Sequence, residues 1–223
     1  MIIIQMKKKM NIMQEQSFVK QFHSMVADLK KNSAIDVYLC QFNPPATKDE
    51  LNEARIKFNL TPAMIDFYSE ANGISIQWEK REGKELPDGC VIAGMIDLLP
   101  VQEVFSDWKD NIYFDEDDPC KPLHPIDYFI GNACAGLYLD GSDSPEVYYY
   151  YRGEKPRPLG VDFEGYLQLL LKSRGFWYWP LAIAGPEDDD PSAPMPREER
   201  NFREIMPQLF PDFNQSDFQR LEQ

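Results

Sequence analysis

Histidine is scarce in this sequence of 223 residues, which holds two, His23 and His124. The sequence contains no G-x-S-x-G motif, no H-E-x-x-H motif and no glycine-rich phosphate loop. No set of Cys and His residues has the spacing of a metal site. We therefore expect a protein that is not an enzyme, and that holds no cofactor and no metal. A hydrolase with an unrecognised site is the less favoured alternative.

Long hydrophobic runs are also missing. The apolar run at residues 2–4 is too short for a membrane span or a secretory signal, and it precedes three lysines instead of following them. The four cysteines include no C-x-x-C pair, so free thiols in a reducing compartment are the default. These absences predict a cytoplasmic protein.

Positive charge is in short supply. The chain has 23 Lys and Arg against 37 Asp and Glu, which gives a formal net charge of −14 and a sequence pI of about 4.6. This balance argues against binding nucleic acid or an anionic membrane, because both need basic surfaces. Residues 1–31 run against the trend, with six Lys and two acidic residues. An acidic surface can attract a basic partner, or it can simply keep the protein in solution.

Apolar and aromatic residues are plentiful, at 43% and 13%, so a single globular domain is expected. Amphipathic spacing predicts helices over 17–31, 47–58, 61–71 and 162–171, a short helix over 100–108 and a weak one over 197–206. A capping box joins Thr47 to Glu50, and Thr61 with Pro62 marks a second helix start. Strands are expected over 35–42, 74–78, 90–96, 126–130, 137–139 and 147–151. This order predicts an α+β fold with a largely antiparallel sheet and helices packed against it.

Part of the chain is recognisable. The segment from Thr47 to Trp78, with its second helix start, its aromatic pair and its Asn-Gly turn, resembles the start of the SMI1/KNR4 (SUKH) superfamily. The hairpin ending in Val147 to Tyr150 and the helix starting at Asp162 are also similar to that family. The resemblance covers residues 47–172, and its matching structural positions are Pro62, Phe67, Tyr68, Asn72, Gly73, Phe163 and Leu167.

The resemblance implies a compact α+β domain without a shared catalytic site. Many bacterial members of the family are immunity proteins that bind and neutralise a toxin, whereas fungal relatives regulate cell-wall synthesis. We therefore expect a protein-binding module of the immunity type that acts by stoichiometric binding, with a regulatory adaptor as the alternative. The expected organisation is a flexible leader at 1–16, an SMI1/KNR4-like domain at 17–183, and an acidic, proline-rich linker with a terminal helix at 184–223.

Two kinds of residue are candidates for binding the partner. The stretch 97–118 has eight acidic residues against Lys109, including the run Asp115, Glu116, Asp117 and Asp118. Such a run is most often a plain solvated loop, but it can also steer a toxin domain with a basic surface. It lacks the ligand spacing of a calcium loop. The aromatic candidates are Tyr149, Tyr151, Trp177 and Trp179, for which packing in the core or anchoring of the tail is the competing interpretation.

Overall fold

The structure is a computed structural model that describes residues 16–87, 89–139, 144–184 and 194–220. A seven-stranded antiparallel sheet forms its centre, and each strand pairs with its neighbour in the sequence. The strands are β1 (Ile35–Phe42), β2 (Ile74–Lys80), β3 (Ala93–Leu98), β4 (Leu123–Ile130), β5 (Ala133–Tyr138), β6 (Val147–Tyr151) and β7 (Arg157–Pro158). The expected α+β class with a largely antiparallel sheet is confirmed. The expected leader lies outside the described residues, apart from Gln16.

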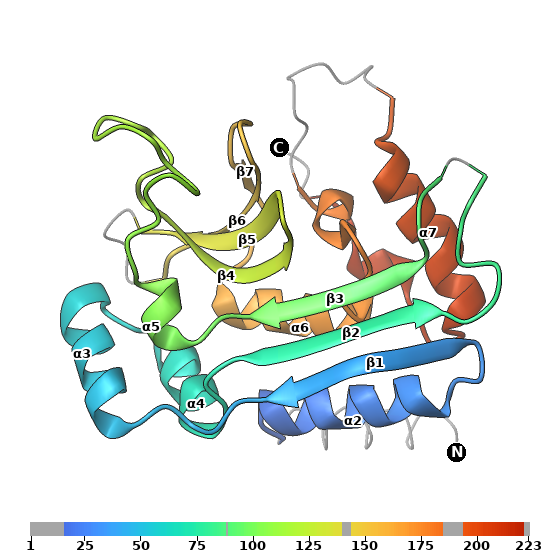
Figure 1. The fold of residues 1–223 in the computed structure, drawn as a ribbon, viewed down its shortest axis with the longest axis horizontal. Helices are drawn as coiled ribbons and strands as arrows, with labels where there is room; N and C mark the ends of the chain where they lie inside the picture. Colours follow the sequence, from blue (N-terminus) through green and yellow to red (C-terminus); the bar gives the residue numbers. More distant parts are fainter. Residues whose placement is uncertain (1–15, 88, 140–143, 185–193, 221–223) are drawn as a thin grey trace.

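The helices lie mostly on one side of the sheet (Figure 1), where α2, α4 and α6 contact one another. The helices are α2 (Phe18–Lys31), α3 (Lys48–Phe58), α4 (Pro62–Glu70), α5 (Val101–Val104), α6 (Phe163–Ser173) and α7 (Arg197–Leu209), with 3-10 turns η1 (Trp179–Ala182) and η2 (Gln215–Asp217). None of the described helices has both the length and the apolar character that a membrane span requires. The short helix expected to reach residue 108 ends at Val104 instead.

Side-chain caps define where three helices begin, as the sequence predicts. The Thr47 hydroxyl accepts a hydrogen bond from Glu50 N, while the Glu50 carboxylate accepts one from Thr47 N at 2.7 Å. The Thr61 side chain accepts a hydrogen bond from Met64 N and caps α4, and the Asp162 side chain accepts one from Gly165 N and caps α6. Each cap satisfies backbone N–H groups that have no partner within the helix, so these starts are local properties of the sequence.

The positions that match the family motif meet in the core. Phe67 and Tyr68 of α4 are buried and lie 5.8 and 6.2 Å, centroid to centroid, from the Phe163 ring of α6. Leu167 is fully buried on the same face of α6. Gly73 has a φ of +102°, which suits glycine, as expected of the turn. The Asn72 side chain accepts a hydrogen bond from Val101 N and thereby ties α5 to the turn.

The sheet is split in the middle. β3 and β4 share one residue pair, Leu98 with Asp127, after which they diverge. The segment after α6 enters this split, where Met95 N donates to Gly175 O at 2.8 Å and Trp177 N donates to Ala93 O at 3.1 Å. Gly175 has a φ of +66°, and a Cβ atom there would lie 2.4 Å from an Ile96 carbon. Only glycine fits this position without displacing β3.

The C-terminal segment belongs to the core, although the sequence placed it beyond the domain. Phe202 and Met206 of α7 are fully buried, and Phe202 packs against Phe176 at 5.8 Å. The Phe210 ring, just after α7, contacts Trp78 of β2 edge-on. The domain therefore extends through the described residues to position 220, and the acidic part of the expected linker, residues 185–193, lies outside them.

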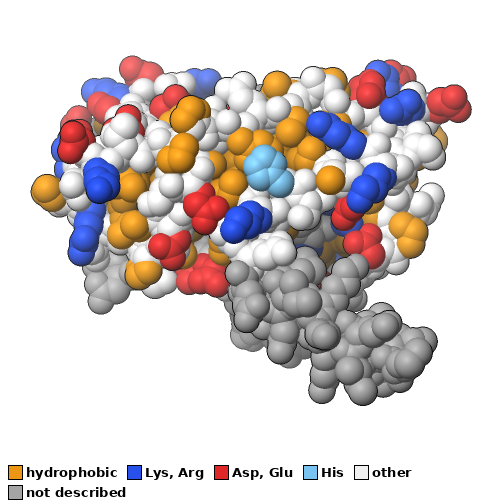
Figure 2. Space-filling model, turned by 90° about the horizontal axis from the view of Figure 1, so that it is seen from below, with side chains coloured by type: hydrophobic (Ala, Val, Ile, Leu, Met, Phe, Trp, Pro, Cys, Tyr) orange, Lys and Arg blue, Asp and Glu red, His pale blue; other side chains and the backbone are white. Residues whose placement is uncertain are grey.

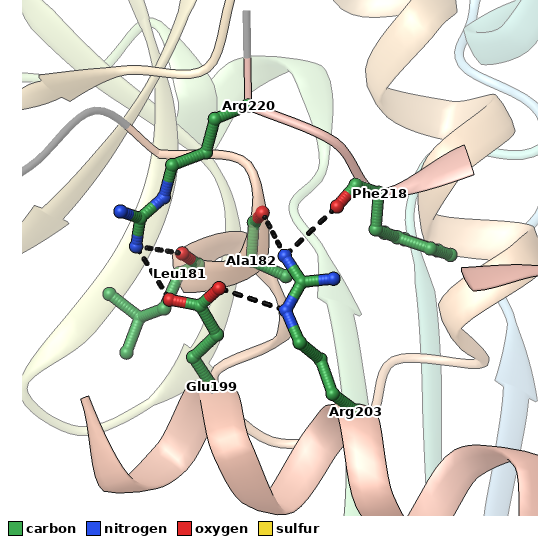
Figure 3. Close-up of polar contacts among 6 residues, drawn as sticks. All are labelled: Leu181, Ala182, Glu199, Arg203, Phe218 and Arg220. Carbon is green, nitrogen blue, oxygen red and sulfur yellow. Dashed lines mark hydrogen bonds and ion pairs between the residues drawn. The ribbon is translucent and has the colours of Figure 1, made fainter. Parts of the chain in front are cut away.

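A buried carboxylate fastens this C-terminal segment (Figure 3). Glu199 of α7 is 2% exposed and pairs with Arg203 at 2.9 Å and with Arg220 at 2.5 Å. Arg203 also donates to the carbonyl oxygens of Ala182 and Phe218. The ion pair of Glu199 with Arg203 thus joins α7 to the end of η1 and to the last described residues.

Candidate protein-binding surface

Residues 105–122, which we call the acidic segment, fold over one face of strands β4–β6. They lie between α5 and β4, on the face of β4–β6 opposite the helices. Ile112, Tyr113 and Cys120 are buried there in a small core of their own, which also contains Leu123, Cys134 and Tyr150. Asp115, Glu116 and Asp117 of the acidic run are exposed, which agrees with the interpretation of that run as a solvated loop. The apolar side chains on either side of the run are shielded from water and anchor it.

Polar side chains of the sheet hold the backbone of this cover. The Tyr150 hydroxyl donates to Ile112 O at 3.2 Å, and the Tyr138 hydroxyl donates to Pro119 O at 2.9 Å. Arg152, just after β6, donates to Asp110 O at 3.4 Å. These bonds fix the segment at several points along its length, so its acidic residues are presented on an ordered scaffold.

Three of the acidic side chains are used inside the segment. Asp118 accepts hydrogen bonds from Cys120 N at 2.8 Å and Phe114 N at 3.1 Å, and these bonds lower the pKa of its carboxyl. Asp107 accepts from the Tyr113 hydroxyl at 2.6 Å, which lowers its pKa as well. Glu116 accepts a hydrogen bond from Lys121 at 2.5 Å, and that bond lowers the Glu116 pKa. These carboxylates shape the loop in addition to charging it.

Two acidic side chains are displayed outward. Asp115 and Asp117 are exposed, and neither carboxylate forms a hydrogen bond or an ion pair within the described part of the chain. Phe114 beside them is 44% exposed, one of few large hydrophobic side chains at the described surface, and Arg152 lies over its ring at 5.6 Å. We call Phe114, Asp115 and Asp117 the acidic tip. It combines a negative charge with an accessible aromatic ring.

The two tyrosine candidates lie on the same face of β6, which packs on the main core. Tyr149 is 2% exposed, stacked near Phe129 and covered by Arg157, whose guanidinium lies 5.0 Å from its ring centroid. It offers no surface to a partner, so its assignment to the interface is wrong. Tyr151 is half-buried and packs against the same core. Tyr150 on the other face is the residue that holds the acidic segment, a contact that the alternation of the strand does not reveal.

The tryptophan candidates act mainly as anchors. Trp179 is 1% exposed and lies between the rings of Tyr166 at 5.4 Å and Phe218 at 6.0 Å. Its burial contradicts the expectation of an interface residue and supports the alternative that it anchors the tail. Trp177 is half-buried and continues the segment that enters the split of the sheet.

One buried polar residue was not a candidate from the sequence. Asp127 is fully buried at the split, where its carboxylate accepts hydrogen bonds from Asp97 N and from the Tyr166 hydroxyl, both at 2.8 Å. Burial raises the pKa of Asp127 to about 7, against the lowering effect of the two hydrogen bonds. Its position within an otherwise apolar strand, Ile126 to Ile130, is the signal in the sequence that could have singled it out.

The side of the molecule along which α2 runs displays side chains of several kinds (Figure 1 and Figure 2). Figure 2 shows acidic, basic and hydrophobic side chains interspersed on the face seen from below. The acidic tip is a candidate for binding a partner because it combines two unpaired carboxylates with an exposed aromatic ring.

Comparison with known proteins adds no family to these observations, since no family model matches the chain and no curated protein matches it either.

Proposed function

We propose that this protein is a non-catalytic binding module of the SMI1/KNR4 type that acts in the cytoplasm. Its partner is a toxin domain with a basic surface, which it neutralises by stoichiometric binding. The observation that carries the proposal is the acidic tip, where Asp115, Asp117 and Phe114 project from an ordered cover of the sheet. The family resemblance supplies the class of partner, and the charge of −14 fits it.

The chemistry of the acidic tip suits association with a basic surface. Exposed carboxylates raise the rate of encounter with a basic partner, and this effect decreases as salt screens the charges. An exposed aromatic ring supplies contact area that a partner can bury after encounter. Because hydrogen bonds to Tyr150 and Tyr138 already order the segment, little conformational entropy is lost when it binds.

The test compares two variants of equal charge. The partner is first identified by co-purification from the native host. Asp115→Asn with Asp117→Asn removes the two unpaired charges of the tip. Glu82→Gln with Glu85→Gln removes two exposed charges from the β2–β3 connection and serves as the control. The association rate constant, kon, is measured for both variants against ionic strength.

The tip variant should associate about three- to ten-fold more slowly than the wild type at low salt, and the difference should vanish near 1 M salt. The control variant should stay close to the wild type. Equal on-rates for the tip variant and the wild type would exclude this loop from the interface. Turnover of the partner by catalytic amounts of the protein would contradict stoichiometric neutralisation.

A further inference from the structure

A cavity of about 450 Å³ opens among three helices, away from the acidic tip. The first residues of α2, the middle of α4 and the first turn of α6 line it. Its apolar lining includes Phe18, Ala63 and the buried ring of Phe67. Asp66, Glu70 and Glu164 add three carboxylates from two different helices. The cavity therefore offers both apolar contact and negative charge to a ligand.

The three carboxylates are not neutralised locally. Glu70 accepts a hydrogen bond from the Ser17 hydroxyl at 2.6 Å, and Glu164 has a long one, at 3.5 Å, from the Gln168 amide. Across the part of the chain that the structure describes, none of the three forms an ion pair with a lysine or arginine. A ligand with two or three positive charges would complete the site.

The chain itself carries such a ligand at the right place. Gln16, the first described residue, lines the cavity, so a segment just before it in the sequence is tethered within reach of the cavity. The sequence just before it contains Lys7, Lys8 and Lys9, followed by the apolar Met10, Ile12 and Met13. Seven residue steps separate Lys9 from Gln16, and an extended chain covers at most about 24 Å in seven steps. The lysines can therefore reach every side of the cavity.

We propose that the segment Lys7–Met13 of this same chain is the ligand of the cavity, with its lysines paired to Asp66, Glu70 and Glu164. Tethering makes this arrangement favourable, because a short linker gives an effective concentration in the millimolar range. A contact with a dissociation constant of about 1 mM is then occupied about half of the time. The complementary charges, with three lysines in the segment and three carboxylates at the cavity, provide such a weak contact at low salt.

Trypsin cleavage of the full chain tests the proposal, since trypsin cuts after lysines that are accessible. Intact-mass spectrometry follows loss of the fragment ending at Lys7, Lys8 or Lys9. In 20 mM salt, the variant Asp66→Asn/Glu70→Gln/Glu164→Gln should lose this fragment about two-fold faster than the wild type, because a segment that is bound half of the time is protected by a factor of about two. In 1 M salt the two rates should agree, because screening releases the segment in both.

A control variant carries the same change of charge elsewhere. Asp49→Asn/Glu82→Gln/Glu85→Gln neutralises three exposed acids outside the cavity and should cleave like the wild type. The single variant Asp66→Asn, which removes no described hydrogen bond, should accelerate cleavage in the same direction if the triple variant is poorly folded. Equal rates in wild type and both cavity variants at low salt would overturn the proposal. Carbodiimide cross-links from Lys7–Lys9 to carboxylates outside the cavity, in place of Asp66, Glu70 or Glu164, would overturn it as well.

Discussion

At the scale of single residues, Asp127 is a carboxylic acid in an environment that disfavours its charge. Its carboxyl is fully buried, and its ionised form is supported by two hydrogen bonds and no cation among the described residues. The negative charge of Asp97 also raises the pKa of Asp127. The charge of Asp127 in turn raises the pKa of the buried Cys134 thiol. Folding therefore favours the protonated form of Asp127, and a dependence of stability on pH follows.

Stability should decrease between about pH 4 and pH 7 because of this residue. The carboxyl ionises near pH 3.8 in the unfolded chain but only near pH 7 in the folded protein. The folded state thus holds the extra proton across that window, and raising the pH removes stability until the folded pKa is passed. A shift of about three pH units corresponds to about 4 kcal/mol, as an upper bound. Urea unfolding at intervals from pH 4 to pH 8 measures the slope.

The variant Asp127→Asn separates this residue from the other acids. An Asn oxygen can still accept from Asp97 N, and its amide can donate to the Tyr166 hydroxyl oxygen. We expect its stability relative to the wild type to increase steadily from pH 4 to pH 7 and then to level off. A constant difference between wild type and variant over this range would show that Asp127 is not the titrating group.

At the scale of elements, the sequence predicts those segments whose structure is decided locally. The caps at Thr47, Thr61 and Asp162 and the apolar faces of α2 and α6 each depend on residues a few positions apart. α7 was expected only as a weak terminal helix because charged residues dominate its sequence, and its packing depends on rings from other elements. Phe202, Met206 and Leu209 are nevertheless spaced four and three residues apart, which indicates the apolar face of an amphipathic helix.

Glu199 should be important for attaching α7. The variant Glu199→Gln leaves Arg203 and Arg220 without their carboxylate in a partly enclosed site. Removing one partner of a buried ion pair typically costs about 3–5 kcal/mol, and we expect the lower end because Arg220 is 39% exposed on its side chain. Chemical denaturation gives the change in the free energy of unfolding.

A matched control lies on the same helix. Glu204 is exposed, and its side chain forms no ion pair within the described chain, so Glu204→Gln should change stability by less than about 0.5 kcal/mol. If both variants unfold at the same denaturant concentration, the buried network contributes no net stability and other contacts of α7 hold it in place.

At the scale of the whole molecule, long-range packing decides which candidate residues are accessible. The sequence identified the acidic run and the aromatic residues as candidates, but it could not show which of them are buried and which of them meet. In a strand that is covered on one side, alternation buries one pair of the four tyrosines 148–151 and leaves the other pair exposed. Residues 105–122 cover the second face, so Tyr150 is buried as well as Tyr149. That contact joins segments about 40 residues apart, and no local pattern encodes it.

The accessible aromatic ring of the acidic tip gives a prediction about binding. Phe114→Ala should raise the dissociation rate constant of the complex by about ten-fold and leave kon nearly unchanged, because contact area acts after encounter. Surface plasmon resonance with the identified partner measures both constants. Ile56→Ala on α3 removes another highly exposed hydrophobic side chain and is the control. A variant Phe114→Ala that dissociates like the wild type would place the bound surface elsewhere.

The neighbour-to-neighbour order of the strands has a consequence for how the chain assembles during synthesis. Since each strand pairs with the one made just before it, the sheet can grow from β1 onward without waiting for a later strand to insert. The split between β3 and β4 is the exception. It closes only when Gly175 to Trp177 enter it, after β7 and α6 have been made. A nascent chain that stops short of these residues leaves a row of backbone groups of β3 unpaired, and completion of the fold therefore depends on its last quarter.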